Sequence, residues 1–234
     1  MIVHTKLTLQ FLVGLWLAGL LFSAGSQPLQ AAEAKAPATA TVAVAPALNP
    51  LPGLESQVPL LKDKKTVRMR TTAGEIRIEV YPAAAPNAAQ RFLELVKSGF
   101  YNNTPVSRVV PGFVAQFGIN WREPYKAREN SYFKDDLSLF ALERGTLAFA
   151  KAGADTNATQ VFINYTENNR LAARMYNFTT FGKVVSGMDV VERFAEVGEP
   201  GMGLDQDRLW KNGETYLNSL DQKPTMILSA EIAE

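Results

Sequence analysis

Hydrophobic and polar positions begin to alternate at about residue 66. In the run 67–71, apolar residues and threonine alternate with arginines, and in the run 76–81, isoleucine and valine alternate with mostly charged residues. Thr72-Ala73-Gly74 separates the two runs. Period-two alternation is typical of a strand with one buried face. A glycine-containing turn between two such runs predicts a β-hairpin.

The period changes at Pro86. Apolar residues then recur every three or four positions up to Val96, polar residues occupy the positions between them, and Gly99 follows. Proline is favoured in the first turn of a helix and glycine just after its end. The pattern predicts an amphipathic helix of about 12 residues that covers other apolar side chains.

Strand patterns return beyond this helix. They cover residues 105–110, 112–118, 145–150, 160–165, 179–185 and 225–232, and a second short helix is predicted over 187–195. These strands do not alternate regularly with helices, which disfavours a parallel sheet built from βαβ units. We therefore predict a mainly β fold, a closed eight-stranded antiparallel barrel capped by two α-helices, because closure leaves no sheet edge exposed.

The first 34 residues have a different character. Residues 7–25 are uncharged and mostly apolar, Lys6 precedes them, and Ala32-Glu33-Ala34 matches a small-x-small cleavage pattern. This layout predicts a secretory signal peptide over 1–34 and therefore an exported protein. The alternative is an uncleaved anchor, in which residues 7–25 tether the protein to a membrane, since about 20 apolar residues span a bilayer.

Residues 35–64 are rich in alanine and proline. Prolines interrupt helices, and this segment shows no helical stripe. We predict an extended linker over 35–64 and a folded domain over 65–234.

Charge and residue usage narrow the chemistry. The 24 basic and 23 acidic residues give a formal net charge of +1, which does not favour nucleic-acid binding. The chain has no cysteine, so it has no disulfide, thiolate nucleophile or cysteine-ligated metal. Its single histidine, His4, lies in the predicted signal peptide. Catalysis by the mature protein must then use other side chains or need no proton transfer.

Four ordered motifs carry the candidate chemistry. They are SRVVPGFVAQ at 107–116, GTLAFAKA at 145–152, TQVFIN at 159–164 and FGKVVSGMDVV at 181–191. Together they resemble the cyclophilin family of peptidyl-prolyl cis-trans isomerases, above all its exported bacterial members. The resemblance extends from about residue 67 to residue 232 and implies the same eight-stranded barrel with two capping helices.

The implied reaction suits the available side chains. Isomerisation of an X–Pro bond breaks no covalent bond, and its barrier of about 20 kcal/mol comes from amide resonance. An enzyme lowers this barrier by binding the twisted amide better than the planar one. Arginine suits this task because it is always charged and presents a rigid fork of donors.

The resemblance also implies roles for individual residues. Arg108, Phe113 and Gln116 correspond to the catalytic set, with Gln116 and Gln160 orienting the arginine and the substrate backbone. The residues implied to bind substrate are Val114, Ala150, Lys151, Ala152, Gln160, Phe162, Arg170, Leu171 and Phe178. The resemblance implies no metal and no cofactor. It implies proline-containing segments of exported proteins as partners, and we expect a monomer.

Four positions depart from the family pattern. A histidine is frequent where this chain has Ser107, a methionine where it has Val114, a large aromatic residue where it has Arg170, and histidine or tyrosine where it has Phe178. These departures leave open an alternative function, a cyclophilin-fold peptide-binding or scaffold domain with little isomerase activity. A barrel that carries a small apolar ligand is a third hypothesis, which the order of helices and strands disfavours.

The sequence also bears on the compartment. Asn102, Asn157, Asn164 and Asn177 each begin an N-x-S/T sequon. Glycans at Asn157 or Asn164 would flank the implied substrate strand and obstruct it. The periplasm of a bacterium is therefore favoured over a eukaryotic secretory compartment.

Overall fold

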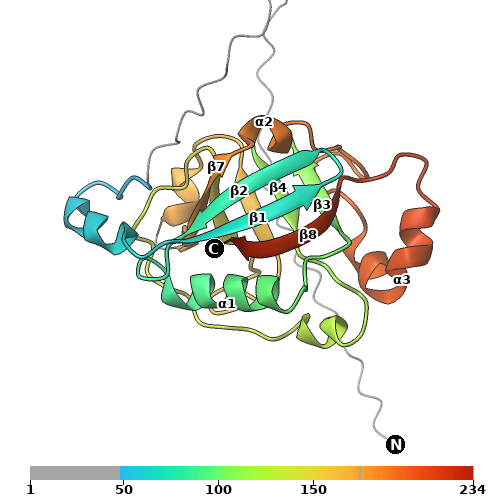
Figure 1. Ribbon diagram of the computed structural model, residues 1–234, viewed down its shortest axis with the longest axis horizontal. Coiled ribbons are helices and arrows are strands. Elements are labelled where there is room, and N and C mark those ends of the chain that lie inside the picture. The colour runs from blue at the N-terminus through green and yellow to red at the C-terminus, as the bar shows by residue number, and fades with distance from the viewer. Residues whose placement is uncertain (1–47, 174, 234) are drawn as a thin grey trace, which may run out of the picture. The chain divides into compact units, whose positions relative to one another are not determined.

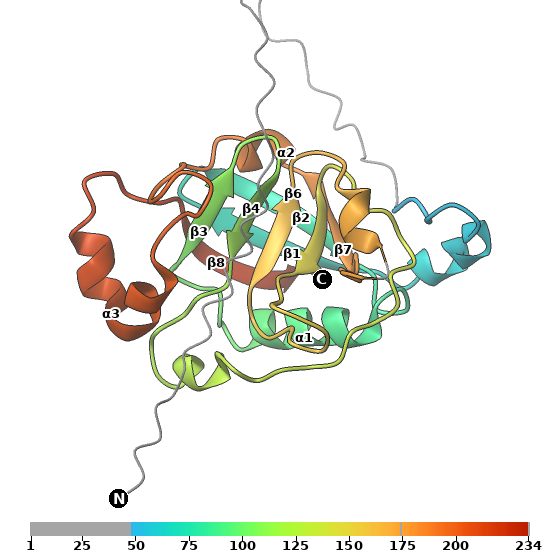
Figure 2. The same ribbon diagram turned by 180° about the vertical axis from the view of Figure 1, so that it is seen from behind.

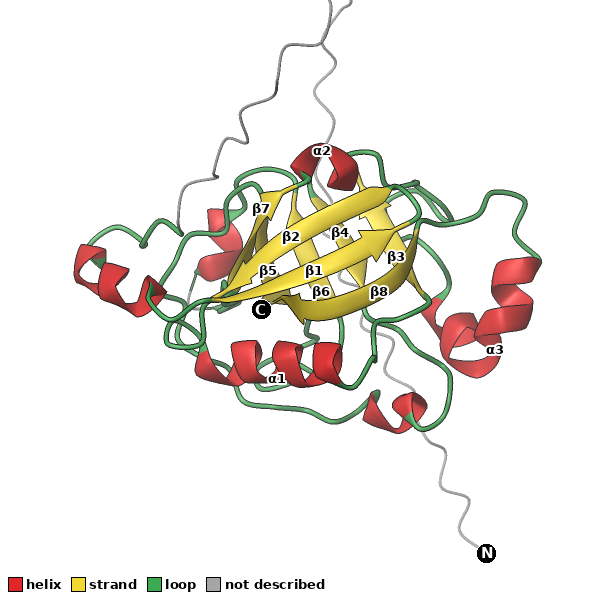
Figure 3. Cartoon of the chain, viewed as in Figure 1, coloured by secondary structure: helices red, strands yellow, loops and turns green. Residues whose placement is uncertain are grey.

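The computed structural model describes residues 48–173 and 175–233 (Figure 1). The predicted signal peptide at 1–34, His4 and the first part of the predicted linker, 35–47, lie outside the described residues. The strands are β1 (Lys65–Thr71), β2 (Gly74–Val80), β3 (Thr104–Val110), β4 (Val114–Phe117), β5 (Thr146–Phe149), β6 (Val161–Asn164), β7 (Gly182–Ser186) and β8 (Met226–Ala233). Every pairing is antiparallel, in the closed order β1-β2-β7-β5-β6-β4-β3-β8. The predicted eight-stranded barrel is confirmed (Figure 3).

Helices lie around this barrel. The α-helices are α1 (Pro86–Lys97), α2 (Met188–Val191) and α3 (Gln206–Asn218), and the 3-10 helices are η1 (Glu55–Leu61), η2 (Tyr125–Arg128) and η3 (Asn169–Ala172). Figures 1 and 2 show α1 and α2 at opposite ends of the barrel and α3 beside β3 and β8. α1 has the predicted length, whereas α2 is shorter than predicted and α3 was not predicted.

The inside of the barrel is filled by side chains. Val67, Met69, Ile76 and Ile78 are at most 1% exposed and belong to one large apolar cluster. The apolar face of α1 closes this cluster through residues that include Phe92, which is fully buried. Because its own side chains fill the interior of this barrel, a site for a polypeptide has to lie on the outside.

Residues 48–64 belong to the folded unit, in contrast to the predicted linker. Leu48 is 2% exposed and packs with Tyr81 and Phe140. The N–H of Leu51 donates to the carbonyl oxygen of Leu139 at 2.9 Å, and η1 follows. Leucines in this segment find apolar partners on the barrel, and burial of such side chains outweighs the weak local preference for an extended chain.

Candidate active site

Arg108, Gln116 and Phe162 occupy one row on the outside of the barrel, the outer row. The strand registers pair Arg108 with Gln116 and Gln116 with Phe162. Paired residues on neighbouring strands point to the same side of a sheet. The next row contains Val109 and Ala115, which are buried in the inner cluster. Successive residues point to opposite faces, so the row of Arg108 faces outward.

A β-bulge at Ser107 turns Arg108 to this outer face. Val106 pairs with Phe117, and both are buried in the inner cluster, yet Arg108 already pairs with Gln116. Two residues of β3 therefore span one residue of β4. In a regular strand without the bulge, strict alternation would point Arg108 inward with Val106.

Arg108 is held through one of its three nitrogens. Its Nε–H donates to the carbonyl oxygen of Gly201 at 2.8 Å, and its guanidinium carbon lies 5.8 Å from the centre of the Phe113 ring. Among the described residues, neither terminal amino group has a hydrogen-bond or acidic partner. Burial lowers the pKa of Arg108, but an arginine in a protein keeps its proton. The result is a partly desolvated cation with free donors beside an aromatic ring.

A row of side-chain amides runs beside this cation. Gln116 Nε2 donates to Gln160 Oε1 at 2.8 Å, and Gln160 Nε2 donates to Gln206 Oε1 at 2.9 Å. In the described part of the chain, Gln116 makes no hydrogen bond to Arg108. Gln206 is the first residue of α3. This helix therefore continues the row of amides that begins at Gln116 on β4 and includes Gln160, the residue just before β6.

A turn places Phe113 outside the barrel. The N–H of Phe113 donates to the carbonyl oxygen of Val110 at 2.9 Å, and Gly112 between them has a φ of 71°. Proline at the second position and glycine with positive φ at the third are the requirements of a type II turn, and the chain has Pro111 and Gly112 there. The turn explains how Phe113, Val114 and Gln116 reach one site although they could not share one face of a regular strand.

A second apolar cluster covers the outside of β4, β5 and β6. Its buried members are Val114, Leu142, Ala148, Phe162 and Ala172, and the partly buried residues packed on it are Leu51, Phe113, Ala150, Leu171 and Phe178. The rings of Phe162 and Phe178 meet edge to face, with 5.6 Å between their centres. The implied pocket residues Phe113, Val114, Phe162, Leu171 and Phe178 therefore come together.

Arg170 lies at the edge of this cluster. It is exposed, and its guanidinium carbon lies 5.9 Å from the centre of the Phe113 ring. Phe113 therefore has guanidinium groups of both Arg108 and Arg170 within 6 Å of its centre. The aromatic face is attractive to cations, which accounts for both contacts.

The segment from Ala150 to Ala152 is held by the protein itself. The N–H of Ala150 donates to Gln160 O at 2.9 Å, and the N–H of Ala152 donates to Thr156 Oγ1 at 3.0 Å. The N–H of Lys151 has no partner among the described residues.

The side chain of Lys151 has an internal role. It is 4% exposed, and its Nζ donates to Asp135 Oδ2 at 2.6 Å and to Asn177 O at 3.0 Å. The same Nζ lies 5.5 Å from the centre of the Phe178 ring. Lys151 thus ties two loops together beneath Phe178, and only its backbone is available to a ligand.

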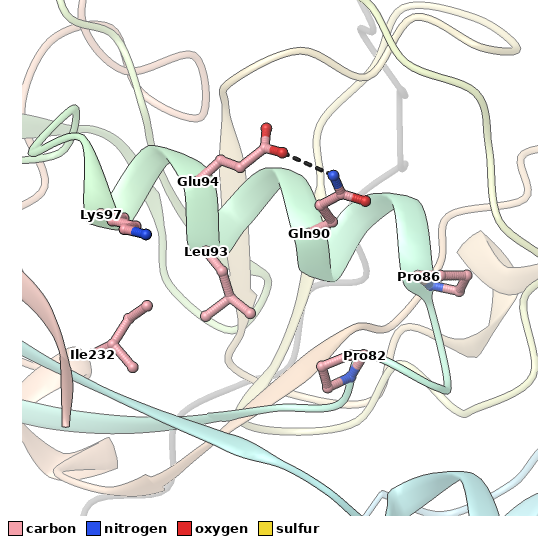
Figure 4. A pocket seen from close by; sticks show the side chains of 7 residues that line it. All are labelled: Pro82, Pro86, Gln90, Leu93, Glu94, Lys97 and Ile232. Atoms are coloured by element: carbon pink, nitrogen blue, oxygen red, sulfur yellow. Dashed lines mark hydrogen bonds between the residues drawn. The ribbon is translucent and has the colours of Figure 1, made fainter. Parts of the chain in front are cut away.

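A shallow hollow of about 390 Å³ lies elsewhere, between α1 and β8 (Figure 4). It is lined by Pro82, Pro86, Gln90, Leu93, Glu94, Lys97 and Ile232. The hollow shares no residue with the outer row. Two of its polar side chains bind each other, since Gln90 Nε2 donates to Glu94 Oε1 at 2.9 Å. The residues that line the hollow do not form a recognisable arrangement of catalytic side chains.

The described residues contain neither a cluster of metal ligands nor a membrane-spanning helix. Within 48–173 and 175–233, no group of three or more acidic, histidine or cysteine side chains could hold a metal ion. No helix in the same ranges is long and apolar enough to cross a membrane.

Known proteins with similar sequences come from one family. The family model for "Cyclophilin type peptidyl-prolyl cis-trans isomerase/CLD" matches residues 66–212. A peptidyl-prolyl cis-trans isomerase of Acinetobacter baylyi is 36% identical over 172 residues, which cover 71% of this chain and 84% of that protein. Peptidyl-prolyl cis-trans isomerase B of Escherichia coli is 34% identical over 155 residues, which cover 60% of this chain and 90% of that protein.

Solved structures agree at the level of the fold. The crystal structure of a cyclophilin type peptidyl-prolyl cis-trans isomerase from Cryptosporidium parvum superposes with a TM-score of 0.55 at 22% identity. The match covers 73% of this chain and 98% of that one. The chain belongs to the cyclophilin-type peptidyl-prolyl cis-trans isomerase family. It is an enzyme of this class.

Sequence reasoning missed several residues at the site. Gly201 and Gln206 contact Arg108 and Gln160, and Leu51 and Leu142 pack on the outer apolar cluster. A signal for α3 was present, because Asp205 caps it by accepting from the N–H of Arg208, as a helix-starting aspartate does. Leu51 and Gly201 carry no such signal, since their contacts are with residues far away in the sequence.

Proposed function

We propose that the outer row and the apolar cluster beside it bind an X–Pro segment of a polypeptide and catalyse its isomerisation. The observation that carries this proposal is the juxtaposition of a partly desolvated guanidinium with the ring of Phe113. Both terminal amino groups of this guanidinium lack a hydrogen-bond partner within 48–173 and 175–233. The proline ring would pack on Phe113, Phe162 and Leu171 while the preceding residue rotates. The free N–H of Lys151 would bind the peptide backbone.

The proposed mechanism needs charge but no proton transfer. When the X–Pro bond twists, amide resonance is lost and the proline nitrogen regains its lone pair. Arg108 would donate to that nitrogen and stabilise the twisted form more than the planar one. The carbonyl oxygen of Gly201 orients the arginine without neutralising its charge. Partial burial strengthens the interaction because few water molecules compete.

The test is replacement of Arg108. Arg108→Ala is expected to leave the fold intact and to lower kcat/KM by at least ~100-fold, because a preorganised donor is typically worth a few kcal/mol at the transition state. Arg108→Lys is expected to recover little, since the geometry of the fork is lost. A coupled assay on a short proline peptide measures both variants.

The matched control is Arg70→Ala. Arg70 is an exposed strand arginine on β1 and is no part of the outer row. Its replacement is expected to leave turnover near that of the wild type. Turnover near the wild-type value in Arg108→Ala would contradict the mechanism, whereas a folded wild type without turnover would favour a binding or scaffold role for the site.

We also propose that the enzyme acts on exported proteins in the periplasm. The uncharged segment 7–25 and the pattern Ala32-Glu33-Ala34 support export. Mass analysis of protein recovered from the periplasm of an expressing bacterium tests this. A mature chain that begins at Lys35 is the expected product, whereas full-length protein in the membrane fraction would indicate the anchor.

A further inference from the structure

The segment from Gly198 to Gln206 forms a small hairpin next to Arg108. The N–H of Glu199 donates to Gly203 O at 2.9 Å, and the N–H of Gly203 donates back to Glu199 O at 2.8 Å. Gly198, Gly201 and Gly203 all have φ between 72° and 82°. Residues that carry a side chain rarely adopt a positive φ, so the hairpin needs glycine at these three positions.

Both ends of this hairpin are anchored in the protein. Val197 is 5% exposed and Leu204 is 2% exposed, and both belong to the inner apolar cluster. Immediately afterwards α3 begins, and its Leu209 is fully buried in the same cluster. Because the hairpin is fixed at both ends, it can hold the groups that it contacts in a defined position.

The hairpin touches the bulge itself. The N–H of Leu204 donates to the carbonyl oxygen of Ser107 at 2.8 Å, which satisfies a carbonyl that the bulge takes out of the strand ladder. A Cβ atom on Gly203 would lie 2.4 Å from that oxygen and 2.7 Å from the Cα of Arg108. Only glycine permits so close an approach at this position.

The same segment also contacts the side chain of Arg108 and the row of side-chain amides. Gly201 O accepts from Arg108 Nε at 2.8 Å across 93 positions of sequence, and Gln206 Oε1 accepts from Gln160 Nε2 at 2.9 Å. The segment 198–206 therefore contacts the backbone of the bulge, the guanidinium and the amide row. No other element among the described residues makes a hydrogen bond to the Arg108 side chain.

We propose that the segment 198–206 is the positioning element of this enzyme, which holds the bulge at Ser107 and the guanidinium of Arg108 in the catalytic geometry. The inference rests on the proposed function of Arg108. It adds Gly203 and Gln206 as positioning residues that act through Arg108 and Gln160. Gly201 contributes only its backbone carbonyl.

Gly203→Ala is the main test. The added methyl group is expected to push the hairpin from the bulge and to lower kcat/KM by ~10-fold, since a shift of about 1 Å in a catalytic group costs up to 100-fold. The loss should appear in kcat with KM little changed, because the contact acts on the transition state. Gly201→Ala is the second variant; it strains a φ of 72° where no atom lies within 4 Å of the new methyl group.

Gln206 is tested by a pair of variants. Gln206→Ala removes the acceptor of Gln160 and is expected to lower kcat/KM by ~3-fold, the loss typical of one exposed or half-buried neutral hydrogen bond. Gln206→Glu keeps an acceptor and is expected to lose less. Lys211→Ala is the matched control, since Lys211 is an exposed residue on the same helix.

Two measurements separate positioning from a general structural role. In an Arg108→Ala background, Gly203→Ala is expected to cause no further loss, because the residue through which it acts is absent. In a 1H–15N spectrum, the Nε–H signal of Arg108, assigned by its disappearance in Arg108→Lys, is expected to shift in Gly203→Ala. The second measurement needs no activity, so it also decides the matter if the wild type proves inactive and the proposed function fails.

The inference would be overturned by any of three results. These are unchanged turnover in folded Gly203→Ala and Gly201→Ala, an equal loss in both the wild-type and the Arg108→Ala background, or an Nε–H signal that stays in place in both glycine variants.

Discussion

Arg108 combines a permanent charge with partial burial. Burial lowers its pKa, yet the guanidinium remains protonated over the whole physiological range. A histidine in the same position would change its charge between about pH 5 and 8. The chain has a single histidine, His4, and it lies in the predicted signal peptide.

The first prediction at this scale concerns pH. We expect kcat/KM to be flat between about pH 6 and 8, because the proposed chemistry moves no proton and its cation does not titrate there. Initial rates across this range, at constant ionic strength, provide the measurement. A bell-shaped profile would reveal a general acid or base that the mechanism lacks.

Arg170 presents an exposed charge at the rim of the apolar cluster. Cyclosporin is the family's cyclic, largely apolar inhibitor, and the resemblance implies that a tryptophan at this position contacts it in sensitive members. A guanidinium removes a broad apolar contact and adds a solvated charge that is costly to bury without a partner. A short proline peptide is less affected, since its ring would sit on Phe113, Phe162 and Leu171.

The second prediction follows from this rim. We expect weak cyclosporin inhibition of the active wild type and at least ~10-fold stronger inhibition of Arg170→Trp, about 1.4 kcal/mol. Titration of both proteins with the drug makes the comparison. Inhibition of the wild type at nanomolar drug, or no effect of tryptophan, would show that Arg170 does not form the rim.

Among the elements, α1 depends on a residue from a distant loop. The residue at its N-terminal cap, Ala85, has no side chain that could accept a hydrogen bond. Asp136 supplies the acceptors instead, since Oδ1 accepts from the N–H of Asn87 at 3.1 Å and Oδ2 accepts from the N–H of Ala88 at 2.8 Å. Burial raises the pKa of Asp136, against the effect of these two donors.

Removal of this carboxylate is expected to weaken the helix and the barrel end that it closes. Asp136→Ala should lower the free energy of unfolding by about 1–2 kcal/mol, because the N–H groups of Asn87 and Ala88 lose their partners. Asp136→Asn should lose less, as the amide oxygen still accepts one bond. Urea denaturation followed by circular dichroism compares both with the control Asp221→Ala, which removes an exposed loop carboxylate; equal midpoints for all three would refute the cap.

For the whole molecule, the filled barrel has a consequence for stability in alkali. The fully buried Tyr101 donates to Thr159 O at 3.1 Å, and Tyr165 donates to Val191 O at 3.0 Å. Burial raises the pKa of Tyr101 well above its usual value and raises the pKa of Tyr165 to about 12. The native state therefore keeps protons that the unfolded chain releases near pH 10.

Stability is expected to fall as the pH rises above about 10, because the unfolded state then binds fewer protons than the native state. For Tyr165 the decline continues up to its native pKa of about 12. Tyr165→Phe removes one such proton and should give a shallower decline in the free energy of unfolding between about pH 9 and 11.5. Tyr132→Phe, at a site that is 56% exposed, is the control, and identical slopes for both variants would disagree with the prediction.

The sequence by itself determined the barrel and the length of α1, and it singled out residues that the fold brings together. Period-two and helical patterns are local, and β1, β2 and α1 each bury one face in accordance with their own pattern. The four motifs also placed Arg108, Gln116 and Phe162 on strands that pair in one row. The predicted chemistry of these residues remains a prediction.

Tertiary structure alone decided which way Arg108 points and what holds it. The bulge at Ser107 reverses the alternation of β3, and its carbonyl is satisfied by Leu204, far away in the sequence. Gly201 and Leu51 likewise reach the site through distant contacts, and no local pattern encodes such pairings. Backbone hydrogen bonding and apolar burial between remote segments choose among conformations that local propensity leaves nearly equal in free energy.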